Sequence, residues 1–365
     1  MIRIAITALL LASMAQGQPA SGSIEGSITS TLTITGSGFG SKVPAAPILW
    51  DRVINQSAYI SRGISSGDVV PVENDGGGYT DCPWYSSSVI GGNRVTYNTV
   101  SPRVVNGATY RIFEKGYLTH NDLGSGSTNQ VIYVNWWFRT SGNIDGHSSK
   151  LIRVWNNPSV SEGNDMSSSW TAMHMTRDQD DNHDGIEDEP APSWQSWGGN
   201  IGTWNNLEYT ADGTGDIGHG WGTIKTYTNY TLIHDVNYWS DEAFNYIDLV
   251  GLDSAVEYTT GMTFDLSDIY IDNTRARVLL GDSADYESCT HFEIQPPTDW
   301  SSGSITVSGN RGSFSSSDDL YLYVVNAEGE VSPSEAVTPS QALSKSIVFI
   351  HHSTGQAYLD QGLRA

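Results

Sequence analysis

An acidic segment near the middle of the chain carries oxygen-bearing side chains at a spacing that suits a hard cation. Asp180, Asn182 and Asp184 alternate along it, and Gly185 permits a tight turn before Asp188 adds a further carboxylate. Ca2+ takes six to eight oxygen ligands at roughly 2.3–2.6 Å, whereas these acids would repel one another without a cation. The predicted calcium ligands are Asp178, Asp180, Asn182, Asp184 and Asp188, with Glu189 in reserve. The alternative is a solvated acidic loop without metal.

The same segment, DDNHDGIED at residues 180–188, resembles the calcium loops of thrombospondin type 3 repeats and dockerins, whose pattern is D-x-D/N-x-D-G-x-x-D. It departs from a full EF-hand, because the sequence shows no flanking amphipathic helices and no Glu at the twelfth loop position. The resemblance implies Ca2+ as the cofactor. We expect the ion to order a long insertion between strands, since metal binding offsets the entropy lost on fixing a polar loop.

A second set of candidate residues lies on the strand predicted at residues 131–140. One face of this strand carries Ile132, Val134, Trp136 and Phe138, and the other carries Tyr133, Asn135, Trp137 and Arg139. Successive side chains of a strand point to opposite faces. This sheet is therefore expected to cover a core with one face and to line a groove with the other.

Two further strands repeat this alternation. Residues 151–155 place Ile152 and Val154 on one face, and residues 264–272 place Ile269 and Ile271 inward. Aromatic faces stack on sugar rings, and polar side chains bond to sugar hydroxyls. The predicted polysaccharide-binding residues are Tyr133, Asn135, Trp137, Arg139, Arg153, Trp155, Asp268 and Tyr270. For any single aromatic residue among them, packing in a core is the alternative.

Composition indicates an all-β protein. The chain has 365 residues with 38 Gly, 18 Tyr and 12 Trp, and its strands are separated by turns rich in Gly, Asn and Ser. Such strands predict packed antiparallel sheets. We expect an antiparallel β-jelly-roll sandwich over residues 48–280, with the calcium loop as an insertion. A small immunoglobulin- or fibronectin-like β-sandwich is expected over residues 281–340.

Several segments resemble the concanavalin A-like jelly roll of lectins, laminin-G modules and polysaccharide-active enzymes. These are WWFR at 136–139, KLIRVW at 150–155, WNNLEY at 204–209 and DLSDIYID at 265–272. The resemblance implies glycan binding on a concave sheet. Upstream, TLTITGSGFG at 31–40 resembles the opening strand of IPT/TIG domains. We therefore expect residues 18–47 to form a flexible segment and one IPT-like strand.

The same scaffold leaves an enzymatic alternative open. Retaining glucanases of this fold use an E-x-D-x-E triplet, which the sequence lacks. A polysaccharide lyase would need a cation against a uronate carboxylate and a His or Tyr to take a proton. The candidate catalytic residues are Arg139, His147, Lys150 and Arg153, with Tyr133 or Tyr270 as further bases. A structural or adhesive surface protein is a third alternative.

The net charge of the protein and its first residues indicate which partners it binds and where it is located. The formal net charge of −23 argues against nucleic acid, which needs a basic surface. Residues 1–17 combine one Arg, a short apolar core and small residues, which predicts a signal peptide and a secreted protein. No later stretch is apolar for long enough to insert into a membrane. The expected partner is extracellular polysaccharide, with surface or matrix components as further candidates.

The two cysteines and the chain end leave alternatives open. Cys82 and Cys289 could form a disulfide or remain separate buried thiols. Residues 341–365 are expected to be a tail or the stub of a further domain. Together these features predict a secreted, calcium-binding jelly roll that binds polysaccharide through an aromatic and polar concave face.

Overall fold

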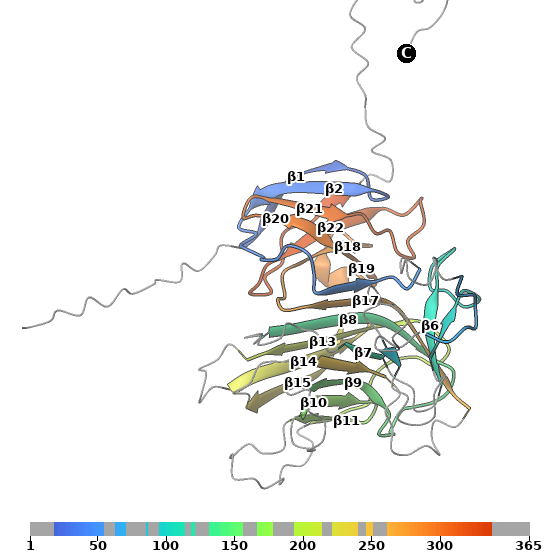
Figure 1. Ribbon diagram of the computed structural model, residues 1–365. Coiled ribbons are helices and arrows are strands. Elements are labelled where there is room, and N and C mark those ends of the chain that lie inside the picture. The colour runs from blue at the N-terminus through green and yellow to red at the C-terminus, as the bar shows by residue number, and fades with distance from the viewer. Residues whose placement is uncertain are drawn as a thin grey trace, which may run out of the picture.

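The described elements are strands, apart from one 3-10 turn, η2 (Tyr286–Ser288). The computed structural model describes residues 18–54, 63–70, 85–86, 95–113, 118–120, 131–155, 166–177, 193–213, 221–239, 246–250 and 261–337. Its strands form four antiparallel sheets, paired as a larger and a smaller sandwich that lie one on the other (Figure 1). The predicted fold class, an all-β jelly-roll sandwich with a smaller β-sandwich, is confirmed. No helix among these residues is long and apolar enough to cross a membrane.

The larger sandwich consists of sheets I and II. Sheet I contains, in spatial order, β15 (Thr231–Trp239), β14 (Trp221–Thr228), β13 (Asn205–Asp212), β8 (Val131–Thr140), β17 (Thr263–Asp272), β6 (Thr109–Phe113) and β5 (Val95–Asn98), with β3 (Leu49–Asp51) paired to β17. Sheet II contains β12 (Ser193–Trp194), β11 (His174–Arg177), β10 (Met166–Thr171), β9 (Lys150–Trp155), β16 (Tyr246–Leu249), β7 (Leu118–His120) and β4 (Tyr85–Ser86).

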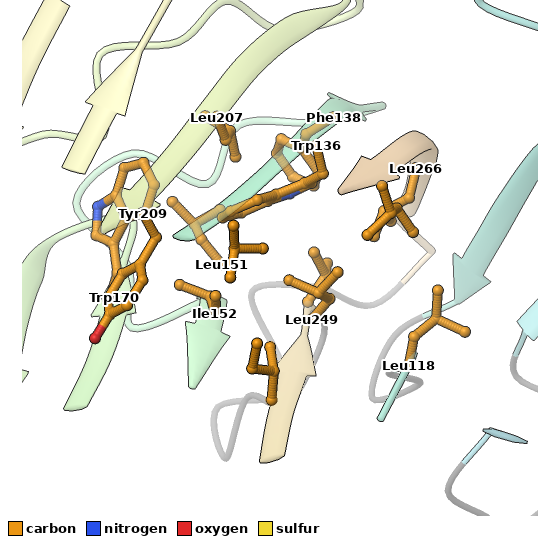
Figure 2. Close-up of a cluster of buried hydrophobic side chains, with 14 of the residues drawn as sticks. Leu118, Trp136, Phe138, Leu151, Ile152, Trp170, Leu207, Tyr209, Leu249 and Leu266 are labelled. Atoms are coloured by element: carbon orange, nitrogen blue, oxygen red, sulfur yellow. The ribbon is translucent and has the colours of Figure 1, made fainter. Parts of the chain in front are cut away.

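The core of the larger sandwich lies between these two sheets (Figure 2). Trp136 and Phe138 of β8 point into it with no exposed area, and Trp170 of β10 meets Trp136 edge-on at 6.1 Å between ring centroids. The alternation predicted for residues 131–140 is confirmed, as are the inward positions of Ile269 and Ile271. Leu151 is also in this core rather than on the outer face.

The smaller sandwich consists of sheets III and IV. Sheet III contains β1 (Ala20–Gly26), β2 (Thr31–Ser37), β21 (Ser304–Ser308) and β20 (Pro297–Trp300). Sheet IV contains β19 (Phe292–Gln295), β18 (Arg277–Gly281), β22 (Leu320–Val325) and β23 (Glu335–Val337).

The N-terminal segment belongs to this smaller sandwich, which corrects the predicted division of residues 18–47. Residues 20–26 form β1 instead of a flexible segment, and β2 pairs with β21, with Thr31 opposite Ser308. Leu32 and Ile34 are almost fully buried in the second core. The segment resembles an IPT strand because apolar residues alternate along any strand that covers a core with one face. The larger sandwich is thus inserted between β2 and β18.

Both connections between the sandwiches meet at one buried ion pair. Lys42, before β3, places its ammonium 2.9 Å from Asp272 at the end of β17. The same ammonium donates to the carbonyls of Pro44, Ala45 and Ala46 at 3.3, 2.7 and 3.2 Å. The segment 44–46 that leads into β3 is therefore held around this ammonium.

The outer face of sheet I packs against sheet IV. A third apolar cluster joins Tyr133 of β8 and Tyr270 of β17 to Phe292, Ile294 and Tyr323 of the smaller sandwich. Tyr133 and Tyr270 are 1% and 0% exposed. The two sandwiches therefore share a continuous buried interface.

A buried arginine bridges this interface. Arg103 donates to Asp268 of sheet I, and its two Nη atoms donate to Glu293 of sheet IV at 2.5 and 2.9 Å. All three side chains are at most 3% exposed. Burial alone would raise the pKa of Glu293, but Arg103 and His291 outweigh it and hold that pKa below its ordinary value. Asp268 reaches the bridge from a bulge in β17, where its φ is +48°.

Arg103→Met should destabilise the protein by about 3–5 kcal/mol, because it leaves two buried carboxylates without their shared cation. The free energy of unfolding from urea denaturation measures this loss. Arg311→Met, at an arginine whose Nη1 donates only to the exposed Ser315 carbonyl, is the control and should change stability by less than about 0.5 kcal/mol. A loss under about 1 kcal/mol for Arg103→Met would show that the bridge does not hold the sandwiches together.

A buried histidine lies where β15 meets sheet II. His234 is 1% exposed, its Nδ1 lies 2.8 Å from Ser193 Oγ, and its Nε2 has no partner among the described residues. Burial, reinforced by the neighbouring His174, lowers the pKa of His234 to about 4. The imidazolium is therefore disfavoured in the folded protein.

Since the unfolded pKa is about 6.5, the stability that neutral His234 contributes should be lost as pH falls from about 6.5 to 4. The loss should be on the order of 2–3 kcal/mol, because a one-unit difference in pKa is worth about 1.4 kcal/mol before solvent screening. His234→Gln removes the titrating group, so its free energy of unfolding should fall less between pH 7 and 4.5 than that of the unmodified protein. Equal pH dependence in both proteins would contradict this assignment.

Candidate functional site

The residues predicted to bind sugar on sheet I do not line an open groove. Tyr133, Asn135, Trp137, Asp268 and Tyr270 do share the outer face of this sheet, but each is less than a tenth exposed. The smaller sandwich covers them. The prediction of a groove is therefore wrong here, because this face is an interface between the two sandwiches. Aromatic and polar residues are as typical of such an interface as of a sugar-binding groove.

Protein groups already satisfy these side chains. Trp137 stacks on His291 at 5.0 Å and lies 4.5 Å from the Arg103 guanidinium carbon. Asn135 and Asn206 exchange two amide hydrogen bonds of 2.9 and 3.1 Å. Tyr270 donates to Asp272 at 2.6 Å. Sugar would have to displace these partners to reach this part of the face.

The remaining candidates are divided between the two sheets. Arg139 lies on sheet I, where it donates to Asp265 and to the Ser101 carbonyl and covers the Trp204 ring at 4.7 Å. Arg153 and Trp155 belong to β9 of sheet II, on the other side of the core. These residues therefore do not form one concave face.

The lyase candidates are separated in the same way. Lys150 donates to the carbonyl and hydroxyl of Ser148 at 2.9 and 3.0 Å, and His147 precedes it in a turn before β9. Arg139 lies on β8 of sheet I, whereas Lys150 and Arg153 lie on β9 of sheet II. Arg139 is therefore separated from Lys150 and Arg153 by the core between the two sheets.

The predicted calcium ligands Asp178, Asp180, Asn182, Asp184 and Asp188 lie outside the described residues. The strands on either side of them are described: β11 and β12 pair antiparallel, with His174 opposite Trp194. Elsewhere in the described ranges there is no group of three or more His, Cys, Asp or Glu side chains that could hold a metal. Cys82 also lies outside the described residues, and Cys289 is a buried free thiol in this structure.

A cleft opens where the outer face of sheet I extends past sheet IV. Its volume is about 530 Å3, within the roughly 300–1,000 Å3 usual for ligand pockets. Strands β13, β14 and β15 form one wall, and β18, η2, β19 and the turn after β22 form the other. The lining residues are Glu208, Thr210, Lys225, Tyr227, Asn229, Tyr230, Thr231, Arg275, Arg277, Tyr286, Glu287, Cys289, Phe292, Glu328, Gly329 and Val331.

A tight hairpin turn positions one aromatic wall of this cleft. Asn229 and Tyr230 connect β14 to β15 with φ values of +47° and +67°, as in a type I′ turn. Asn tolerates this conformation, whereas Tyr adopts it rarely. The Tyr230 hydroxyl compensates by donating to the Phe292 carbonyl at 3.2 Å and accepting from the Phe292 N–H at 2.7 Å. The turn thus fastens sheet I to sheet IV beside the cleft.

Tyrosine rings dominate the apolar part of the cleft. Tyr286 packs against Phe292 at 4.9 Å, and Tyr227 stands half-buried on β14. Burial raises the pKa of Tyr227, Tyr230 and Tyr286 above the ordinary tyrosine value. All three therefore keep their protons at neutral pH, and the Tyr230 proton is already donated to the Phe292 carbonyl.

Basic and acidic side chains line the polar part. Lys225 pairs with Asp235 at 3.1 Å, and Arg275 pairs with Asp212 at 3.3 Å. Arg277, by contrast, lies 3.8 Å from its nearest carboxylate, Glu208.

Sequence reasoning missed this cleft because two distant parts of the chain form it. Tyr227 and Tyr230 lie on the hairpin of β14 and β15, whereas Arg277 and Tyr286 belong to the smaller sandwich. Neither sandwich forms the cleft by itself, because each supplies only one of its walls. The Thr-Asn-Tyr-Thr turn at 228–231 was the one local signal.

Comparisons with known proteins do not assign this chain to a family. No protein-family model matches it, and no curated protein matches it. Similar solved structures include a carbohydrate esterase from the Shiga toxin-encoding bacteriophage phi24B, with 11% identity over 57% of this chain and 98% of that one and a TM-score of 0.34. An alginate lyase from Chlorella virus has 9% identity over 62% and 99%, with a TM-score of 0.38. The receptor-binding domain of botulinum neurotoxin type G has 12% identity over 68% and 69%, with a TM-score of 0.32. At such scores these likenesses carry no argument about activity.

Proposed function

We propose that this protein is a glycan-binding protein whose binding site is the cleft between the two sandwiches. One observation carries the proposal: the cleft combines tyrosine rings with side chains that donate and accept hydrogen bonds, in a volume of about 530 Å3. Ring faces can stack on the apolar side of a sugar, while Thr210 and Thr231 can bond to its hydroxyls.

Binding suits this site better than lyase chemistry. A tyrosine that abstracts a proton needs a pKa lowered toward the working pH. The pKa values of Tyr227, Tyr230 and Tyr286 are instead raised by burial. No histidine is among the residues that line the cleft. The cleft is thus suited to hold a sugar and unsuited to break its glycosidic bond by elimination.

Secretion and calcium binding remain part of the proposal. The signal-like residues 1–17 and the acidic pattern at 178–188 support them from the sequence. Because β11 and β12 pair with one another, the two ends of the acidic segment are fixed side by side, which reduces the entropy lost when an ion orders it. The proposed protein is a secreted, calcium-stabilised glycan binder.

Tyr227→Ala should weaken glycan binding at least tenfold, because it removes a stacking surface worth about 1.4 kcal/mol. Glycan arrays would identify a ligand, and isothermal titration calorimetry would give the affinities. Trp194→Ala is the control, since Trp194 is 58% exposed on β12 and lies outside the cleft. If Tyr227→Ala leaves affinity unchanged while Trp194→Ala abolishes it, the cleft is not the binding site.

Ca2+ should raise the melting temperature, and excess chelator should reverse the increase. At free Ca2+ about a hundredfold above the dissociation constant, binding to the folded state stabilises by about 2.7 kcal/mol. Asp184→Asn should remove the effect, while Asp299→Asn, at an exposed acid on β20, should keep it. Differential scanning calorimetry with Mg2+ in parallel tests selectivity. Equal shifts in the two variants would point to general screening of charge.

A further inference from the structure

One residue of the cleft, Arg277, is a buried cation with too few partners. It is 8% exposed, and its side chain lies on the wall that β18 contributes. Its Nη1 donates to the Arg275 carbonyl at 2.9 Å, and its guanidinium carbon lies 4.5 Å from the Tyr133 ring centroid. Its Nε is buried without a hydrogen-bond partner among the described residues.

Glu208 does not accept a hydrogen bond from this guanidinium. Its Oε1 lies 3.8 Å from Arg277 Nη2, which is beyond hydrogen-bonding distance. Its Oε2 accepts the Tyr133 hydroxyl at 2.7 Å, which holds the carboxylate away. A buried donor left unsatisfied costs free energy, and a buried charge without a close partner costs more.

Arg103 shows what a fully satisfied arginine looks like in this protein. It lies equally deep, yet it bonds two carboxylates, Asp268 and Glu293. Arg277 differs from it in one respect that matters here: it faces a cleft. A planar guanidinium presents its donors as a fork that matches a carboxylate.

The other charges of the cleft narrow the ligand class. Lys225 and Arg275 are paired with Asp235 and Asp212, so Arg277 is the least neutralised of the three cations that line it. Glu287 and Glu328 are exposed on the lining, and the whole chain carries a formal charge of −23. These charges disfavour a densely anionic polymer such as a nucleic acid. They are compatible with a ligand that carries one isolated negative group and places it against Arg277.

We infer that the cleft takes an acidic glycan and binds a sugar carboxylate on Arg277, with the sugar ring against the cleft tyrosines. This inference rests on the proposed function of the cleft and assigns its ligand class. Galacturonate and glucuronate residues that are spaced by neutral sugars present such a carboxylate.

Calorimetry with matched oligosaccharides tests the assignment. Uronate-containing tetrasaccharides would be compared with the same tetrasaccharides after reduction of their carboxyl groups to alcohols. We expect the unmodified protein to bind at least one acid form ten or more times more tightly than its reduced form. Arg277→Gln should bring that ratio close to one without abolishing binding of the reduced form.

Two further variants guard against misfolding and simple charge effects. Arg277→Lys keeps the charge but loses the fork, so it should retain only part of the preference. Arg311→Gln, at an arginine outside the cleft whose Nη1 donates to the Ser315 carbonyl, should keep the full preference. Near-ultraviolet circular dichroism would confirm that each variant is folded.

The outcomes separate this inference from the function on which it rests. Equal binding of acid and reduced forms, still sensitive to Tyr227→Ala, would overturn the acidic-ligand assignment and leave the glycan site standing. Tighter binding of sulfated than of uronate tetrasaccharides would overturn the choice of carboxylate. Absence of binding to every acidic and neutral glycan would overturn the proposed function and the inference with it.

Discussion

The structure depends on a guanidinium buried between two β-sandwiches. Arg103 satisfies Asp268 on one side and Glu293 on the other, and the apolar cluster around Tyr133, Tyr270 and Phe292 excludes water from the same interface. Removing these charges from water is costly, so the arrangement tolerates little displacement of one sandwich relative to the other. The bridge therefore fixes the relative position of the two sandwiches, and with it the geometry of the cleft that both of them line.

The cleft is a product of that geometry. Sheet IV covers the outer face of β8 and β17 but not the whole of β13, β14 and β15, so one face of sheet I is an interface over part of its width and a wall of the cleft over the rest. Binding residues from two sandwiches are thereby held at fixed separation without a flexible loop between them. Sites supported by rigid elements can position several weak contacts at once.

Local pattern predicted the strands well and their surroundings poorly. The alternation of residues 131–140 identified both faces of β8, because side-chain direction in a strand follows directly from backbone geometry. The same alternation could not say what Tyr133 and Trp137 face, since a sugar groove and a protein interface favour the same residue types. Arg277 and Tyr227 were missed because their proximity arises from packing between segments about fifty residues apart, which no strand pattern encodes.

The order of the strands has a consequence for synthesis. β2 needs β21 as its neighbour, yet Ser304 leaves the ribosome only after the whole larger sandwich has been made. Until then the nascent chain carries an unpaired β-edge at its start, and the aromatic face of β8 and β17 stays in water. Biogenesis of this protein must therefore keep both surfaces from contacting other chains until β21 has been synthesised.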